Sequence, residues 1–161
     1  MSKKQETSES PIPLQNEDNV GISVTVQYIK DVSFENPKPL TSLMIRDRAP
    51  EIDVNIQVYT TGLGENAYEV SLIVQGQASF DDEPAFIVEL TYAGIFILEN
   101  VPEELIQPIL LIECPRILFP FARNIVADLT RDGGYPSLML KPIDFAELYR
   151  QRQVMPEEGH A

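Results

Sequence analysis

The sequence predicts an α+β fold in which a four-stranded antiparallel sheet is followed by helices. Four stretches between residues 22 and 92 alternate apolar and polar side chains, the period-two pattern of strands with one buried face. From residue 101 onward, apolar residues instead recur every three or four positions, which is the spacing of an amphipathic helix. With 161 residues, of which 43% are hydrophobic and 23% charged, the chain has room for one such domain.

The first expected strand covers residues 22–35, and its even-numbered positions are the apolar ones. It ends at the proline-rich Asn36-Pro-Lys-Pro39. Residues 36–50 then form a long connection with two equally good interpretations: a loop packed back on the core, or a loop that borders a binding groove. Residues 1–19 are polar and lack periodicity, which predicts a disordered arm before a single domain at 20–152.

The remaining strands are expected at 51–58, 68–80 and 86–92. Short turns at 61–64 and 81–84 separate them, and turns of that length cannot carry a parallel crossover. The sheet is therefore expected to be meander-like, with one long first crossover. In all four strands the even-numbered face is apolar, and the odd-numbered face carries the acids Asp31, Glu35, Glu51, Asp53, Glu69 and Glu89.

The helical part begins at Val101-Pro-Glu-Glu104, where proline and acids suit a first turn. Pro108 and Pro115 are expected to limit this piece to a short or broken helix, because proline lacks an amide hydrogen and its ring crowds the preceding turn. A long amphipathic helix then covers residues 114–129, with Pro115 near its start and a restart or kink at Pro120.

The pair Gly133-Gly134 is expected to end this long helix. An extended connector follows at 135–142, and Asp144 with Glu147 opens a short C-terminal helix in the manner of a capping box. Residues 153–161 are predicted to be a disordered tail.

The net charge of −13 is concentrated in the middle of the chain. Residues 20–113 carry fifteen acidic and four basic residues, whereas residues 114–161 carry six of each. Such an acidic body repels phosphate backbones, which argues against nucleic-acid binding and favours a basic protein partner. No apolar run is long enough for a transmembrane helix, and the amino terminus lacks the apolar stretch of a signal peptide, so we expect a cytoplasmic protein that does not insert into a membrane.

Catalytic and metal-binding constellations are hard to assemble from this sequence. The one histidine, His160, lies in the predicted tail, and the single cysteine, Cys114, permits neither an internal disulfide nor a cysteine-based zinc site. The acidic Asp81-Asp-Glu83 is interpreted as a solvated turn rather than a metal site. Phosphate-binding glycine loops and the GxSxG motif are missing. We therefore expect no enzyme, no cofactor and no metal, and interpret the protein as a binding surface.

Four motifs then occur in a definite order and spacing. They are Tyr28-Ile-Lys-Asp-Val-Ser-Phe-Glu-Asn-Pro37, Ala85-Phe-Ile-Val-Glu89 with Gly94-Ile-Phe96, Cys114-Pro-Arg-Ile-Leu-Phe-Pro-Phe-Ala-Arg123, and Pro142-Ile-Asp-Phe-Ala-Glu-Leu-Tyr149. Together they make residues 20–150 resemble the SecB family of protein-export chaperones. The resemblance implies a protein that holds unfolded precursors in the cytosol without hydrolysing nucleotide and passes them to the export motor SecA. It also implies a homotetramer, a dimer of dimers with helices between two eight-stranded sheets.

The resemblance further implies roles for three sets of residues. The acidic patch that docks SecA matches Asp31, Glu35, Ile87 and Glu89 on the odd-numbered face. The hydrophobic client groove, between the helices and the 36–50 connection, would use Phe34, Leu40, Leu43, Met44, Phe145 and Tyr149. Assembly of the tetramer would involve the even-numbered Phe86, Val88, Leu90 and Tyr92, together with Leu118, Phe121 and Ile125 of the long helix.

Two other functions stay open at this point. Some relatives of the family are dedicated chaperones of an antitoxin, and the sequence does not separate the two roles, although Asp31, Glu35 and Glu89 favour export. The second alternative is an α+β domain that houses an enzyme or a small-ligand pocket. It requires an enclosed polar site with a titratable residue, and the sequence offers none.

Overall fold

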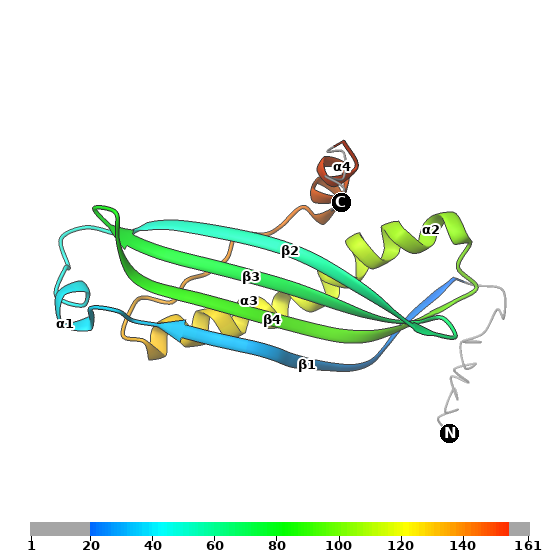
Figure 1. The fold of residues 1–161 in the computed structure, drawn as a ribbon, viewed down its shortest axis with the longest axis horizontal. Coiled ribbons are helices and arrows are strands. Elements are labelled where there is room, and N and C mark those ends of the chain that lie inside the picture. Colours follow the sequence, from blue (N-terminus) through cyan, green and yellow to red (C-terminus); the bar gives the residue numbers. More distant parts are fainter. Residues whose placement is uncertain (1–19, 155–161) are drawn as a thin grey trace, which may run out of the picture.

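The computed structural model describes residues 20–154, so the predicted arm at 1–19 and most of the predicted tail lie outside the described residues. Four long strands form one antiparallel sheet: β1 (Gly21–Glu35), β2 (Glu51–Gly64), β3 (Ala67–Phe80) and β4 (Glu83–Glu99). Their spatial order is β1-β4-β3-β2. The strands β2, β3 and β4 form a meander, and the 36–50 connection, with its short helix α1 (Pro39–Ser42), carries the chain to the opposite edge of the sheet (Figure 1). The predicted sheet with one long crossover is confirmed.

Both hairpins turn on two residues with positive φ. Glu65 and Asn66 have φ values of 46° and 64°, and Asp81 and Asp82 have values of 49° and 65°. Two successive left-handed residues make a type I′ turn, whose twist matches the flanking strands, and Asn and Asp tolerate this conformation well. The prediction that Thr61-Gly-Leu-Gly64 forms the first turn is wrong, because β2 continues through these residues and the chain reverses at the next two.

Strand β1 departs from simple alternation because it contains two β-bulges. Its register against β4 shifts between Val24 and Val26, and again between Ile29 and Asp31. Each bulge reverses which side chains face the helices. Between the two bulges the odd-numbered residues therefore face the helices, whereas elsewhere in the strand the even-numbered residues do. The prediction that even-numbered residues face the helices throughout β1 is therefore wrong for residues 26–29, and it holds on either side of them.

One continuous helix of 30 residues, Glu103–Asp132, follows the sheet. It consists of α2 (Glu103–Pro108), the π-helical turn η1 (Ile109–Glu113) and α3 (Cys114–Asp132). The prediction that Pro108 and Pro115 interrupt the helix is wrong. The wider π-helical turn that lies between them accommodates a proline ring and a missing amide hydrogen without ending the helix. The helix axis changes direction between α2 and α3, as is common at π-helical turns (Figure 1).

Pro120 lies inside α3 without ending it. Its position is on the exposed face of the helix, where water can bind the backbone carbonyl that has lost its amide partner. The helix then ends at Gly133-Gly134 as predicted. Gly134 has a φ of 95°, and the amide of Tyr135 donates to the Thr130 carbonyl at 3.1 Å, an arrangement typical of a Schellman motif.

Helix α4 (Phe145–Val154) follows an irregular connector. Asp144 Oδ1 accepts a hydrogen bond from the backbone amide of Glu147 at 3.0 Å, which is the predicted helix cap. The Glu147 carboxylate does not complete a capping box, because it pairs with Arg150 at 2.6 Å instead. The helix continues two residues into the stretch predicted to be the tail.

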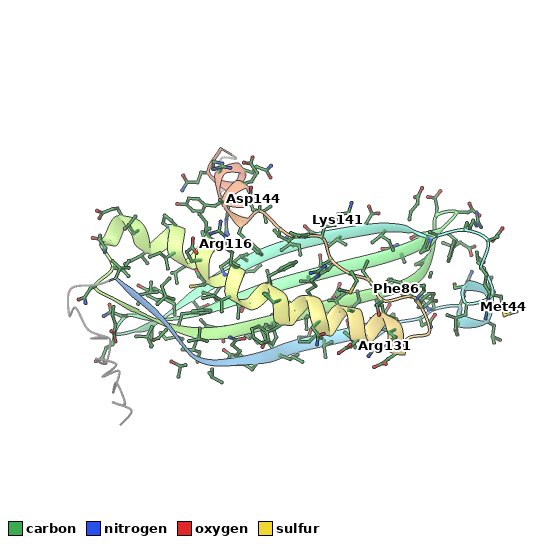
Figure 2. The ribbon with its side chains drawn as sticks, turned by 180° about the vertical axis from the view of Figure 1, so that it is seen from behind. Met44, Phe86, Arg116, Arg131, Lys141 and Asp144 are labelled. Atoms are coloured by element: carbon green, nitrogen blue, oxygen red, sulfur yellow. The ribbon has the colours of Figure 1, made fainter. Side chains whose placement is uncertain are left out.

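The core lies between the long helix and the even-numbered face of the sheet, and the helix covers only that face (Figures 1 and 2). Most of the fully buried side chains come from β3, β4 and the long helix, and include Leu72, Val74, Val88, Leu90, Phe96, Leu110, Leu118 and Val126. Burying a side chain of this size is worth about 1.5–3 kcal/mol.

Candidate functional site

A hollow of about 790 Å³ opens between the 36–50 connection and the connector that follows α3. Its apolar lining comes from four segments and includes Leu43, Ile45, Pro50, Ile52, Phe80, Phe86, Tyr135 and Leu138. Two arginines of the connection, Arg46 and Arg48, also line the hollow. A concave surface of this size and chemistry suits apolar side chains of a bound polypeptide.

Arg48 fixes one end of the 36–50 connection beside the hollow. Its guanidinium donates two hydrogen bonds to the Asp81 carboxylate, at 3.0 and 2.7 Å, and lies 5.5 Å from the centre of the Phe80 ring. These hydrogen bonds hold the pKa of Asp81 below its ordinary value and raise that of Arg48. A two-point contact of this kind defines the position of the loop against the β3–β4 hairpin.

Asn36 fixes the other end of the connection. Its Nδ2 donates to the Gly133 carbonyl at 3.1 Å, and its Oδ1 accepts a hydrogen bond from the Tyr135 hydroxyl at 2.8 Å. The same hydroxyl lies 3.0 Å from the Ala85 carbonyl. The connection is therefore tied at both ends to the segments that form the other walls of the hollow.

The two glycines after α3 also allow close packing at the hollow. A Cβ added to Gly133 would lie 2.3 Å from Cζ of Phe34, and one added to Gly134 would lie 3.1 Å from Cδ2 of Leu43. Sequence reasoning treated this pair only as a helix stop. The signal it missed is the second glycine, because one left-handed residue is enough to end a helix.

The six predicted client residues do not form one groove. Leu43 lines the hollow, and Phe34 borders it by stacking on Phe86 with 5.7 Å between ring centres. In contrast, Leu40 and Met44 are 89% and 74% exposed and lie outside the lining, with Met44 at the tip of the molecule (Figure 2).

The last two predicted client residues lie on α4, far from α1 (Figure 1). Phe145 is only 1% exposed and packs edge-on against Phe119, with ring centres 5.9 Å apart. Tyr149 is half-buried and its hydroxyl accepts a hydrogen bond from Gln153 at 2.7 Å. Sequence reasoning missed the residues that complete the hollow: Ile45, Pro50, Ile52, Phe80, Tyr135 and Leu138. They are separated widely along the chain, and only the fold brings them together.

A second candidate surface lies on the opposite, odd-numbered face of the sheet. Strand pairing sets Glu35 opposite Ile87, and Ser33 opposite Glu89, while Asp31 lies opposite Thr91. Asp31, Glu35, Ile87 and Glu89 therefore share one face, as alternation predicted, and we call this set the acidic face. Its three carboxylates are exposed, and no salt bridge found between residues 20 and 154 involves them.

Glu69 lies on the same side of the sheet but is already paired. Lys30 Nζ donates to its Oε1 at 2.8 Å, and the Tyr28 hydroxyl donates to its Oε2. The hydrogen bond from Lys30, followed by that from Tyr28, holds the pKa of Glu69 below its ordinary value. Burial, followed by the contact with Glu69, raises the pKa of Tyr28 to about 12. The Glu69 carboxylate is thus paired, whereas no salt bridge among residues 20–154 involves the carboxylates of the acidic face.

Apolar surface remains uncovered along the helix side of the edge strand β1. Ile29 and Val32 are exposed there, and Phe121 of α3 is 50% exposed while it stacks on Tyr92 at 6.1 Å. By length and composition the 30-residue helix could cross a membrane, and 28% of its most apolar window is buried in the single chain. Its inner face packs on the sheet, which is typical of the core helix of a globular protein.

The residues predicted to take part in assembly differ in accessibility. Phe86, Val88, Leu90 and Leu118 are buried inside the chain, and Tyr92 nearly so. Ile125 is half-buried and Phe121 is exposed. The buried residues can affect a contact between chains only by shaping the surface above them, whereas Phe121 can contact a second chain directly.

Catalytic and metal chemistry finds little support in the described part of the chain. No group of three or more His, Cys, Asp or Glu residues in it could hold a metal ion. Burial, with a smaller contribution from Glu113, raises the pKa of the Cys114 thiol to about 12, so this cysteine is neutral and weakly nucleophilic near pH 7.

The sequence matches known proteins over nearly its whole length. The family model described as preprotein translocase subunit SecB matches residues 15–155. A protein named protein-export protein SecB from Paramagnetospirillum magneticum is 52% identical over 149 residues, which are 91% of this chain and 96% of the relative. A protein of the same name from Afipia carboxidovorans is 49% identical over 137 residues, 85% of each chain.

A solved structure supports the fold. It is that of the SecB-like chaperone Rv1957 from Mycobacterium tuberculosis in complex with a ChAD peptide from the antitoxin HigA1. The TM-score is 0.60 over 76% of this chain and 90% of that one, with 15% sequence identity. At this identity the likeness concerns the fold alone.

Proposed function

The chain belongs to the SecB family of preprotein translocase subunits, and we propose that it holds unfolded precursor proteins in the cytoplasm and hands them to the motor ATPase SecA. It is a chaperone of preprotein export and not an enzyme. The observation that carries this function is the family match over residues 15–155, together with relatives at 49–52% identity that are named protein-export proteins.

We propose the hollow as the site where unfolded clients bind. Its apolar lining and its opening toward solvent support this role, since apolar contact does not depend on the client's sequence. Phe34 and Leu43 belong to the proposed site, and Leu40 and Met44 would contact a client segment that continues past α1. Phe145 is too deeply buried to contact a client, so its proposed role is to anchor α4, which carries Tyr149.

We propose the acidic face as the docking site for a basic segment of SecA. Three exposed carboxylates that form no salt bridge with any residue from 20 to 154 attract a basic peptide, and Ile87 supplies an apolar contact among them. The client hollow and the acidic face lie on opposite sides of the sheet. A client and the motor can therefore bind the same subunit together.

A homotetramer is proposed from the uncovered apolar surface beside β1 and α3. Ile29, Val32 and Phe121 are exposed in the single chain, and a second copy would remove them from water. Native mass measurement tests this assembly: a tetramer has four times the 18.1 kDa of the chain, and a monomer would refute it.

The alternative role as a dedicated antitoxin chaperone is not favoured. The relatives at 49–52% identity are named export proteins, whereas the chaperone solved with an antitoxin peptide shares 15% of its sequence.

The docking proposal is tested by titrating a labelled peptide of the SecA carboxyl-terminal segment onto the tetramer. Glu89→Lys should weaken binding by about tenfold or more, because it replaces an attraction by a repulsion. Glu51→Lys makes the same change at an exposed acid of the same sheet side, on the far strand β2, and should leave the affinity near that of the parent. Equal effects of the two substitutions would reject a localised docking site.

A further inference from the structure

The acidic face depends on a feature that alternation alone does not provide. Between the two bulges of β1, Ile29 lies opposite Tyr92 and faces the helices, while Tyr28 lies opposite Ala93 and faces outward. If this alternation continued, Asp31 and Glu35 would face the helices. The second bulge, at Lys30, adds one residue to β1 and turns these acids outward again.

Side chains anchor this bulge to the sheet two strands away. Lys30 belongs to the bulge, and its ammonium group reaches Glu69 of β3 at 2.8 Å. Tyr28, two residues earlier, donates to the same carboxylate. Ala93 of β4 lies between Tyr28 and Ser71 in the register, so the neighbour of Tyr28 on β4 carries only a methyl group.

The anchor is more protected than an ordinary surface ion pair. The Glu69 side chain is 19% exposed and that of Lys30 is 43% exposed, and each oxygen of the Glu69 carboxylate accepts one hydrogen bond. A carboxylate that is held by two donors and largely shielded from water is restrained more firmly than one in a fully exposed pair.

We propose that Lys30, Glu69 and Tyr28 hold the second bulge of β1 in place. The bulge in turn sets Asp31 and Glu35 on the acidic face. These three are positioning residues: they do not contact the motor peptide, but they set the orientation of Asp31 and Glu35, which do. The functional part of this inference rests on the docking role proposed above.

The substitution Lys30→Met separates positioning from simple electrostatics, because the two predict opposite results. It removes a positive charge near the acidic face, so electrostatics alone predicts tighter binding of a basic peptide. If Lys30 positions the acids, two carboxylates lose their orientation, and the basic SecA carboxyl-terminal peptide should bind about fivefold more weakly. Lys30→Arg keeps the pairing with Glu69 and should restore binding.

Lys38→Met is the matched control. Lys38 also pairs with a carboxylate, that of Glu83 at 3.5 Å, but it lies in the 36–50 connection and not at the bulge. It loses the same charge, and peptide binding should be unchanged or slightly tighter. Tighter or unchanged binding in Lys30→Met as well would overturn the positioning role.

A direct measurement of register keeps the inference testable even if the docking site is elsewhere. Ser33 and Glu89 lie directly opposite each other, so the pair Ser33→Cys and Glu89→Cys should form a cross-strand disulfide under mild oxidation. Adding Lys30→Met should slow this reaction severalfold, and the buried Cys114 should not compete. An unchanged rate would refute the positioning role. In contrast, a slower rate combined with no effect of Glu89→Lys on the peptide would reject the docking site and keep the bulge anchor.

Discussion

The substitution Leu43→Ser, compared with Leu40→Ser, tests whether clients bind in the hollow. The two leucines are three residues apart in the same connection, and they receive the same chemical change. Leu43 is half-buried, lines the hollow and packs against Gly134, whereas Leu40 is 89% exposed and lies outside it. Any general effect of a more polar loop is therefore shared, and only the effect of the hollow differs.

The expected magnitude follows from the area that a client would cover. A leucine side chain that becomes fully buried contributes about 1.5–3 kcal/mol, and Leu43 is already half-buried before a client arrives. A client can therefore gain only part of this amount, about 1 kcal/mol, which corresponds to about a fivefold loss of affinity at one site. A long client that occupies several sites of a tetramer would lose more than this, because each weakened contact lowers the combined affinity.

The assay is a titration of the tetramer with a fluorescent client that is kept unfolded, repeated with a short apolar peptide that occupies one site. Leu43→Ser should weaken peptide binding about fivefold and binding of the long client more strongly. Leu40→Ser should leave the affinity for the short peptide near that of the parent, because a peptide confined to the hollow does not reach past α1 to Leu40. The native mass of each variant is measured first, so that a loss of assembly is not mistaken for a loss of the site. Equal losses in the two variants, or none in either, would exclude the hollow as the principal client site.

The remaining predictions concern stability and the packing around the hollow. Leu118→Ala should lower the free energy of unfolding by about 2–5 kcal/mol, measured by denaturant titration, because it empties a fully buried position between α3 and the sheet. The raised pKa of Tyr28 contributes stability that is fully present below pH 10 and is lost as the pH rises from 10 to about 12. The urea concentration at the midpoint of unfolding should therefore fall over this pH range in the parent protein, and it should fall less in Tyr28→Phe. The lowered pKa of Glu69 contributes stability that is present above 4.5 and is lost as the pH falls through its folded value, and Glu69→Gln should reduce this acid sensitivity. Gly133→Ala should displace Phe34, whose ring carbon would lie 2.3 Å from the new Cβ, and a lower melting temperature together with weaker client binding would report it.

The sheet could be predicted because the sequence patterns that specify its strands and hairpins lie within short stretches of the chain. Alternating side chains mark each strand, and the short turns restrict the pairing of β2, β3 and β4 to a meander. The position of β1 beside β4 was not predictable in the same way, because a long connection is compatible with either edge of the sheet. The hollow depends on this placement, since it is β1 crossing to the far edge that brings the 36–50 connection over the connector after α3.

Simple alternation predicted the correct side of the sheet for Asp31 and Glu35, although it did not take the two bulges of β1 into account. Strict alternation put both acids on the odd-numbered face, but the bulges at Thr25 and Lys30 each exchange the two faces on which successive side chains lie. Two reversals cancel, so residues outside the bulges follow the simple pattern and only residues 26–29 violate it. A bulge leaves little trace in a pattern of apolar and polar residues, because Ile29 and Tyr28 suit either face.

The prolines of the long helix led to an error for a related reason. Helix rules treat Pro108 and Pro115 as breaks because they assume the α-helical spacing of hydrogen bonds. A π-helical turn changes that spacing by one residue, and this change lets a proline occupy a helix interior. The apolar pattern on both sides of the turn continues on the sheet-facing side, as Leu110, Cys114 and Leu118 are all buried. Burial of that face against the sheet favours one continuous helix over two short ones.

The alternation of β1 near its end also limits how a client could be released. Phe34 stacks on Phe86 beside the hollow, while Glu35, the next residue, faces the opposite side of the sheet. A motor peptide at Glu35 therefore cannot displace a client by competing for the same atoms. An effect of docking on the client would have to act through the strands, either through β1, by moving Phe34 relative to Gly133, or through β4, where Ile87 follows Phe86 of the hollow. Because Gly133 leaves no free space beside the Phe34 ring, a small shift of β1 would change the wall of the hollow, and β1 is one of the two edge strands, which each pair with a single neighbour in the described sheet.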